Sequence, residues 1–208
     1  MSKLIGLLGD YPGVGKDTAA DYLVRYHGFT RLSFADLLYQ EISVAYGVTV
    51  EELARRDLKE TPQARFALSQ CRERAFVALL LEIEPGLTLR TPLSPRFVLR
   101  KWGTEYRRNE DEDYWARPVF ARMDREPGNY ALTDPRFENE LYGSADRGGI
   151  FVRIDRPEVA PAVLSDHPSE VFARRWKEDY RLRNDSSLAD LYGRLAKMAG
   201  VLLLERTA

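Results

Sequence analysis

The stretch GDYPGVGKDT (residues 9–18) follows the apolar run KLIGLL (residues 3–8) and precedes a segment with the spacing of an amphipathic helix. A short apolar run that ends in glycine is typical of a strand buried on both faces. Glycines at the turn let successive backbone N–H groups point inward around phosphate oxygens, and the positive end of the helix faces the same anion. The pattern therefore predicts a phosphate-binding loop between a strand and a helix.

In such a loop, Lys16 reaches the β- and γ-phosphates of ATP and Thr18 bonds a phosphate near the helix start. The predicted ATP contacts are Gly9, Gly13, Val14, Gly15, Lys16, Asp17 and Thr18.

Two positions depart from the usual pattern. Asp10 stands where the first glycine is expected, so either the loop is one residue longer or Asp10 takes a position that glycine usually fills. Asp17 follows the lysine, where a hydroxyl residue often holds Mg²⁺; its carboxylate can hold Mg²⁺ or cap the helix.

Beyond this loop, predicted strands alternate with predicted helices, which indicates one α/β domain with a mostly parallel sheet covered on both faces. The strands are expected at residues 3–9, 29–34, 129–133, 149–155, 180–184 and 201–204. The helices are expected at residues 17–27, 35–46, 62–84, 95–108, 112–125, 137–147 and 187–198, with another opened by a capping box at 49–52. In the first helix, Ala20, Leu23, Val24 and Tyr26 are expected on the buried side. Residues 156–177 read as an irregular, mobile loop.

Composition limits the classes of partner. With 31 basic and 32 acidic residues, the net charge of −1 provides no global positive field for a nucleic-acid backbone. Cys71 is the only cysteine, which excludes an internal disulfide and favours a reducing compartment. There is no signal-peptide pattern and no apolar run long enough to span a membrane, so a cytoplasmic protein without a membrane partner is expected.

Asp36 follows the second predicted strand, at the edge where ligands bind in open α/β sheets. Its carboxylate can accept a proton from an attacking hydroxyl, orient an attacking phosphate and its Mg²⁺, or cap the next helix.

Several segments in this order resemble the bacteriophage-type deoxynucleoside monophosphate kinases. They are GKDT (15–18), FAD (34–36), SPR (94–96), WGTE (102–105) with Arg108, DPRFENE (134–140), HPSE (167–170) and NDSSL (184–188).

This resemblance implies a three-layer P-loop kinase fold that transfers the γ-phosphoryl group of ATP to a deoxynucleoside 5′-monophosphate for phage DNA synthesis. It implies a helical acceptor-binding region at about residues 48–125 and a lid at about residues 156–178. Asp134 resembles a strand-end acid that holds Mg²⁺, for which Asp17 is the other candidate if it does not cap the helix. Asn184 and Ser186 lie where related kinases pack on adenine. The implied acceptor contacts are Asp36, Arg96, Trp102, Arg108, Arg136 and Asn139. The implied catalytic groups are Lys16, Asp36, Asp134, Arg174 and Arg175, the last two from the lid.

Two alternative functions remain open at this point. One is a related kinase that phosphorylates hydroxymethyl pyrimidines within DNA, which needs a wider cleft and a positive path for a strand. The other is a nucleotide-binding regulator without catalysis. The preferred base and the oligomeric state, including homodimer formation, are left open by the sequence.

Overall fold

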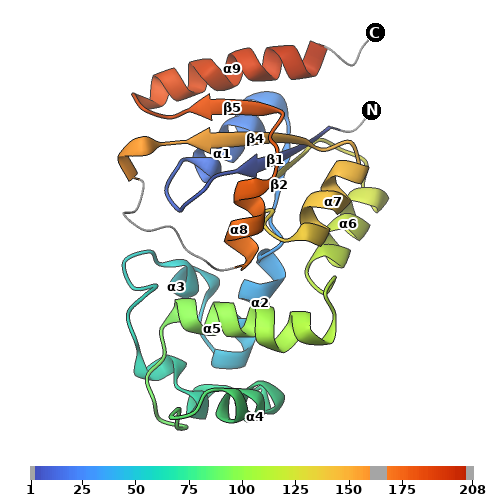
Figure 1. Ribbon diagram of the computed structural model, residues 1–208. Helices are drawn as coiled ribbons and strands as arrows, with labels where there is room; N and C mark the ends of the chain where they lie inside the picture. The colour runs from blue at the N-terminus through green and yellow to red at the C-terminus, as the bar shows by residue number, and fades with distance from the viewer. Residues whose placement is uncertain (1–2, 160–167, 205–208) are drawn as a thin grey trace. The chain divides into compact units, whose positions relative to one another are not determined.

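The computed structural model describes residues 3–159 and 168–204 (Figure 1). The chain divides into two compact units. The sheet unit comprises the segments up to Phe34 and from Pro118 onward, and the helical unit runs from Ala35 to Arg117. The helical unit thus begins and ends earlier than the predicted region of residues 48–125. That both units make up a single domain stays a prediction.

The sheet unit is built on five strands in the order β2-β3-β1-β4-β5, and each pairing of neighbours is parallel. The strands are β1 (Leu4–Leu8), β2 (Thr30–Leu32), β3 (Tyr130–Leu132), β4 (Ile150–Asp155) and β5 (Tyr180–Arg183). In the central register, Leu4 of β1 pairs with Tyr130 and Leu8 with Arg153. The prediction of a mostly parallel sheet is confirmed.

Helices cover both faces of this sheet. Side chains alternate along each strand, so successive residues enter two different cores. Ile5 and Leu7 of β1 belong to the core formed with α1 (Lys16–His27) and α9 (Leu188–Leu204). Leu8 and Phe151 belong to a second core that includes Leu141 of α7 (Glu138–Asp146) and Ala173 of α8 (Pro168–Arg175). The predicted three-layer arrangement is therefore confirmed within the sheet unit.

The first helix ends where glycine allows a backbone turn that other residues adopt with difficulty. Gly28 has a φ of 66° and donates its N–H to the carbonyl of Leu23, which closes α1. The predicted burial within α1 is partly wrong. Ala20 and Leu23 are buried as expected, but Val24 and Tyr26 are 41% and 55% exposed, and Tyr22 is buried instead.

The helical unit packs around its own apolar core, which includes Ile42, Leu53, Phe76 and Trp102. Thr49 and Glu52 form the predicted capping box at the start of α3. Its helices are α2 (Asp36–Tyr46), α3 (Val50–Ala54), α4 (Arg74–Ile83), α5 (Pro95–Lys101) and the π-helix η3 (Trp102–Arg108), with short 3₁₀ turns η1 (Ala64–Phe66) and η2 (Leu68–Gln70).

The predicted long helix at residues 62–84 is wrong in its first half, since a regular helix begins only at Arg74. The N–H of Ser69 donates to the carbonyl of Leu89, and that of Arg72 donates to the carbonyl of Ala45. These backbone groups are bonded outside the segment, so they cannot continue a helical ladder. Similarly, α6 (Ala116–Arg125) starts four residues later than expected.

The prediction of an irregular segment at residues 156–177 is wrong for its second half, which contains α8. The 3₁₀ turn η4 (Pro157–Val159) opens the segment, and residues 160–167 lie outside the described residues. Phe172 and Trp176 pack against the buried cluster of Leu8, Leu141, Phe151 and Ala173. This apolar spacing supports a helix, whereas the proline and charge content had suggested a loop.

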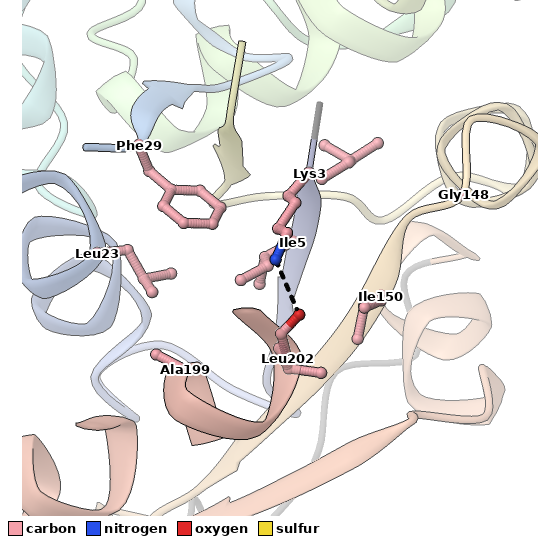
Figure 2. Close-up of a pocket in the computed structure, with 9 residues that line it drawn as sticks. Lys3, Ile5, Leu23, Phe29, Gly148, Ile150, Ala199 and Leu202 are labelled. Atoms are coloured by element: carbon pink, nitrogen blue, oxygen red, sulfur yellow. Dashed lines mark hydrogen bonds between the residues drawn. The ribbon is translucent and has the colours of Figure 1, made fainter. Parts of the chain in front are cut away.

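The predicted last strand at residues 201–204 is also wrong, because α9 continues through it. Leu195, Met198 and Leu202 are buried at the three- and four-residue spacing of one helix face. Figure 2 shows Leu202 and Ala199 beside Ile5, with Nζ of Lys3 donating to the carbonyl of Leu202 at 3.1 Å. Among the described residues, no helix combines the length and apolar character needed to cross a membrane.

Two glycines with different backbone conformations provide a test of this fold. Gly28→Ala is expected to lower the free energy of unfolding by about 1 kcal/mol, because alanine is strained at positive φ. Gly193→Ala, at an exposed position inside α9, is expected to raise it by about 0.5–1 kcal/mol, because glycine weakens a helix interior. Urea unfolding of both variants measures the two signs, and a shared sign would contradict the assigned helix ends.

Candidate nucleotide site

The loop between β1 and α1 has the backbone geometry of an anion cradle. Gly13 and Gly15 have φ values of 86° and 109°, a region that favours glycine. Gly15 is the N-cap of α1 and has no side chain to cover the N–H groups of the first helical turn. A Cβ atom on Gly9 would lie 2.5 Å from Val14 and 3.4 Å from Nζ of Lys16. The loop thus folds back tightly on its first glycine and brings the lysine ammonium over it.

Asp10 has an ordinary backbone conformation in this loop, and its side chain contacts Arg153. Among the described residues, only glycines have positive φ, so Asp10 is not forced into a conformation that requires glycine. Gly9 has no room for a side chain, which favours the alternative of a loop that is one residue longer than usual. The Asp10 carboxylate accepts a hydrogen bond from Nη1 of Arg153, whose side chain is only 3% exposed.

Asn184 contacts the backbone of the phosphate loop. Its Nδ2 donates to the carbonyl of Val14 at 2.8 Å, and the residue is 9% exposed. A Cβ atom on Gly15 would lie 2.7 Å from this nitrogen. Asn184 therefore shapes the phosphate loop in this structure, while Ser186 lies exposed just before α9. The adenine contacts expected of both residues stay a prediction.

Asp134 follows β3 and is held in a fixed orientation. Oδ2 accepts from Oγ of Ser33 at 2.8 Å, and Oδ1 accepts from the N–H of Phe34 at 2.9 Å. The turn after it is fixed by Glu140, which is 2% exposed and accepts from the N–H groups of Arg136 and Phe137. Both carboxylates thus organise the end of the sheet next to the phosphate loop.

A pocket within the sheet unit brings several predicted site residues together. It is lined by Gly9, Lys16, Asp134 and Arg136, together with Ala173 of α8. Arg174 and Arg175 follow Ala173 in the last turn of that helix. Asn139 lies in the first turn of α7, where its Oδ1 accepts from the N–H of Glu140 at 3.0 Å. A cation, a carboxylate and an arginine around a phosphate loop can bind a polyphosphate and balance its charge.

The two carboxylates predicted to hold Mg²⁺ differ in their surroundings. Asp17 is half-exposed and forms an ion pair with Arg31 at 2.7 Å. Asp134 lines the pocket, and Ser33 and Phe34 donate to its two oxygens. Within residues 3–159 and 168–204, no three carboxylate, imidazole or thiol groups gather closely enough to hold a metal ion together. A single oriented carboxylate such as Asp134 fits Mg²⁺, which usually binds proteins through one or two carboxylates plus phosphates and water.

The remaining predicted site residues lie in the helical unit. Asp36 is the first residue of α2, where a carboxylate favours the helix start. Nε of Arg96 donates to Glu60 at 2.9 Å, and Nη1 of Arg108 donates to the carbonyl of Glu112 at 2.9 Å. Both arginines thus have protein contacts in this structure, and their predicted binding of an acceptor phosphate is not tested by it.

Trp102 is predicted to contact the acceptor, but its side chain is 1% exposed and packs on Phe76 and Tyr106. Its Nε1 donates to Glu41 at 2.8 Å. Glu41 also accepts from Arg107 at 2.9 Å and from the hydroxyl of Tyr114. Burial, then the hydrogen bond and charge of Glu41, raise the pKa of Tyr114 to about 12. Trp102 therefore helps to hold the partly buried carboxylate of Glu41 in place, and the surface that direct stacking requires is already covered.

Three residues of the sheet unit were not singled out from the sequence: Arg153, Glu178 and Glu140. Arg153 had a detectable signal, since it is the only charged residue within the run IFVRI (residues 150–154) of a buried strand. A charge at such a position is retained only with a partner. Which carboxylate supplies it depends on the folding of distant segments and has no local signal.

Comparison with curated proteins shows which family the chain belongs to. A protein of Acanthamoeba polyphaga mimivirus, assigned as a deoxynucleotide monophosphate kinase, is 30% identical over 92% of this chain and 93% of its own. The chain belongs to the deoxynucleotide monophosphate kinase family. The deoxynucleoside-5′-monophosphate kinase of Escherichia phage T5 is 27% identical, over 82% of this kinase and 84% of its own chain. The resemblance read from the sequence motifs is thereby confirmed.

Solved structures similar to this kinase have low sequence identity to it. Dephospho-CoA kinase from Campylobacter jejuni aligns with a TM-score of 0.48 at 15% identity, over 97% of each chain. Shikimate kinase from Aquifex aeolicus aligns with a TM-score of 0.47 at 15% identity, over 96% of this chain and 98% of its own. No protein-family model matches the sequence.

The position of Asn184 leads to a prediction about nucleotide binding. Asn184→Ala leaves the buried carbonyl of Val14 without its donor, so the affinity for ATP should fall by about 5- to 100-fold, as the loss of a buried hydrogen-bond partner implies. If Asn184 shapes the loop, inorganic tripolyphosphate should lose affinity to the same degree. A loss confined to ATP would instead favour an adenine contact.

Asn129→Ala is the matched control for this variant. Asn129 also bonds a backbone group, since it accepts from the N–H of Lys3 at 3.1 Å, but it lies at the other end of the sheet, just before β3. Its loss should leave both affinities unchanged in the same competition measurement.

Glu178, which accepts from Nε of Arg153 at 3.0 Å, leads to a prediction about pH. Burial alone would raise its pKa, but hydrogen bonds from its own backbone N–H and from Arg153 and Arg181 outweigh this and lower the pKa from 4.5 to about 2. A lowered pKa in the folded state stabilises the fold fully above the unfolded value, and this stabilisation is lost as the pH falls toward 2.

Glu178→Gln should therefore be less stable than the wild type at pH 7, and the difference should narrow from about pH 5 to pH 3. The midpoints of urea unfolding between pH 5 and pH 3 measure this difference in stability. Glu82→Gln, at an exposed position, is the control. A difference that stays constant with pH would contradict the ion pairing of Glu178.

Proposed function

We propose that this kinase transfers the γ-phosphoryl group of ATP to the 5′-phosphate of a deoxynucleoside monophosphate, giving ADP and a deoxynucleoside diphosphate. The main support is the pocket in which Lys16, Asp134 and Arg136 converge beside the phosphate loop. Both curated relatives are named for this activity. One is from a mimivirus and the other is from a phage. We extend the proposal to nucleotide supply for viral DNA synthesis in the cytoplasm of the host.

The phosphate loop accounts for ATP binding in this proposal. Backbone N–H groups from Gly13 to Thr18 bind the phosphate oxygens, and the start of α1 faces them with its positive end. The ammonium of Lys16 contacts the β- and γ-phosphates and balances the charge that develops during transfer. Arg174 and Arg175, in the last turn of α8, supply further positive charge.

Asp134 and Asp17 are the residues proposed to help hold Mg²⁺, which supplies charge neutralisation on the β- and γ-phosphate oxygens when it is bound with ATP. Asp134 is the better suited of the two, because Ser33 and Phe34 already fix its orientation. Asp17 would first have to leave its ion pair with Arg31.

The acceptor determines what Asp36 has to do. A phosphate monoester loses its second proton at a pKa of about 6, so a deoxynucleotide acceptor at neutral pH attacks as a dianion and needs no general base. Asp36 would then orient the acceptor, while Arg96, Arg108 and Arg136 bind its phosphate. A hydroxymethyl acceptor in DNA would instead require Asp36 to take its proton. Asn139 is proposed to form a hydrogen bond with the acceptor. Trp102 is proposed to act indirectly, by positioning Glu41 through its Nε1 hydrogen bond.

One assay distinguishes these functions. The protein is incubated with γ-labelled ATP and, in separate reactions, with each deoxynucleoside monophosphate and with DNA containing 5-hydroxymethyl pyrimidines. We expect a labelled diphosphate from at least one monophosphate. Label in DNA would favour the second acceptor class, and no transfer to any acceptor would favour a nucleotide-binding regulator.

Substitution of the loop lysine tests the proposed chemistry. Lys16→Ala should lower turnover at least ~100-fold, because it removes a positioned charge from the transferring phosphate. Lys197→Ala, which removes an exposed lysine from α9, should leave turnover unchanged. Steady-state kinetics on folded protein measure both, and near-normal turnover of Lys16→Ala would mean that the loop is misassigned.

A further inference from the structure

Arg153 is a buried cation at the centre of the sheet unit. Its side chain is 3% exposed, and it belongs to β4, opposite Leu8 of β1. Its neighbours along the strand, Val152 and Ile154, are buried in the core with α1 and α9. Side chains alternate along a strand, so Arg153 lies on the opposite face, which α8 covers.

The guanidinium group contacts two separate segments of the chain, the phosphate loop and the end of α8 with the residues just after it. Nη1 donates to Asp10 in the phosphate loop. Nη2 donates to the carbonyls of Ala173 and Trp176, at 3.0 and 2.8 Å, where α8 ends. Nε donates to Glu178 at 3.0 Å, just beyond that helix. One side chain therefore joins the phosphate loop to the end of the helix that carries Arg174 and Arg175.

The chemistry of these contacts makes the geometry rigid. The donors of a guanidinium lie in one plane at fixed angles, so its partners are fixed relative to one another. The arginine side of these ion pairs is buried while Asp10 is 36% exposed, so solvent screens the pairs only in part, and a cation near the last carbonyls of a helix is favourable. An ammonium group at this position carries the same charge, but its donors diverge from one atom and cannot span the same partners.

We propose that Arg153 is a positioning residue that fixes the phosphate loop and the arginine-bearing end of α8 in one arrangement around the γ-phosphate. Asp10 is the point at which the loop is held. This inference rests on the proposed function, because it assigns Arg153 to the placement of Lys16 and the two arginines. It also explains why an aspartate follows Gly9 although the backbone there has no special requirement.

The experiment uses Asp10→Gly, Asp10→Asn and Arg153→Lys in the full chain, with kcat and the KM values for ATP and for the acceptor measured separately. Asp10→Gly, which makes the loop more like the usual pattern, should lower kcat/KM for ATP by about 10-fold or more, since misplacing reacting groups by about 1 Å can cost about 100-fold. The KM for the deoxynucleotide should stay unchanged. Asp10→Asn, which retains an acceptor oxygen, should lose less.

Asp124→Asn is the matched control, because Asp124 pairs with Arg147 at 2.8 Å in the same unit and does not line the nucleotide pocket. It removes one carboxylate from an arginine pair, as Asp10→Asn does, and should leave the kinetics unchanged. Thermal unfolding of each variant shows whether activity is lost through the fold instead.

A double-mutant comparison tests the connection itself. If Arg153 acts through Asp10, the variant with both Asp10→Asn and Arg153→Lys should be no worse in ATP affinity than Arg153→Lys alone. Binding of a fluorescent ATP analogue reports this affinity even if no acceptor is phosphorylated, so a failure of the proposed function is recognised separately. If Arg153→Lys does not fold, the kinetics of Asp10→Gly and Asp10→Asn still test whether the contact with Arg153 positions the phosphate loop.

Two results would overturn the proposal. One is Asp10→Gly with wild-type or better kcat/KM for ATP in a folded protein. The other is an equal loss for ATP and for the deoxynucleotide, which would indicate a general structural role rather than positioning at the γ-phosphate.

Discussion

Parallel pairing of β1 with both β3 and β4 is the constraint on which the rest of the sheet unit depends. Parallel strands end at the same edge of a sheet, so the phosphate loop after β1 and Asp134 after β3 must lie close together. Side-chain alternation along β4 then directs Arg153 toward the face covered by α8. The direction of the strands thus brings the segments of the site together, and the individual side chains then determine its chemistry.

The charges around this edge form an ordered series rather than a general positive surface. Asp10, Arg153, Glu178 and Arg181 follow one another as alternating partners. Their charges compensate one another within the protein. The pocket lining follows the balanced charge of the whole chain, since it contains Lys16 and Arg136 as well as Asp10 and Asp134.

Much of this arrangement could be predicted because local chemistry determines it. The glycine turn, the stop of α1 at Gly28 and the capping box at Thr49 each depend on a few neighbouring residues. The errors occur where distant contacts outweigh local composition. Residues 168–175 form a helix because Phe172, Ala173 and Trp176 have a sheet face to cover, and residues 201–204 continue α9 for the same reason. The contact between Asp10 and Arg153 spans most of the chain and leaves no pattern along it.

The division of the chain has a consequence for its synthesis. The helical unit is continuous from Ala35 to Arg117, whereas the sheet unit combines segments made before and after it. β1 is synthesised well before its neighbours β3 and β4 and its covering helix α9. The strand that leads into the phosphate loop therefore cannot pair with β3 or β4 until the helical unit has been synthesised. Such a strand is exposed to aggregation during translation, and a short β1 with a loop of glycine and charge directly after it limits that exposure.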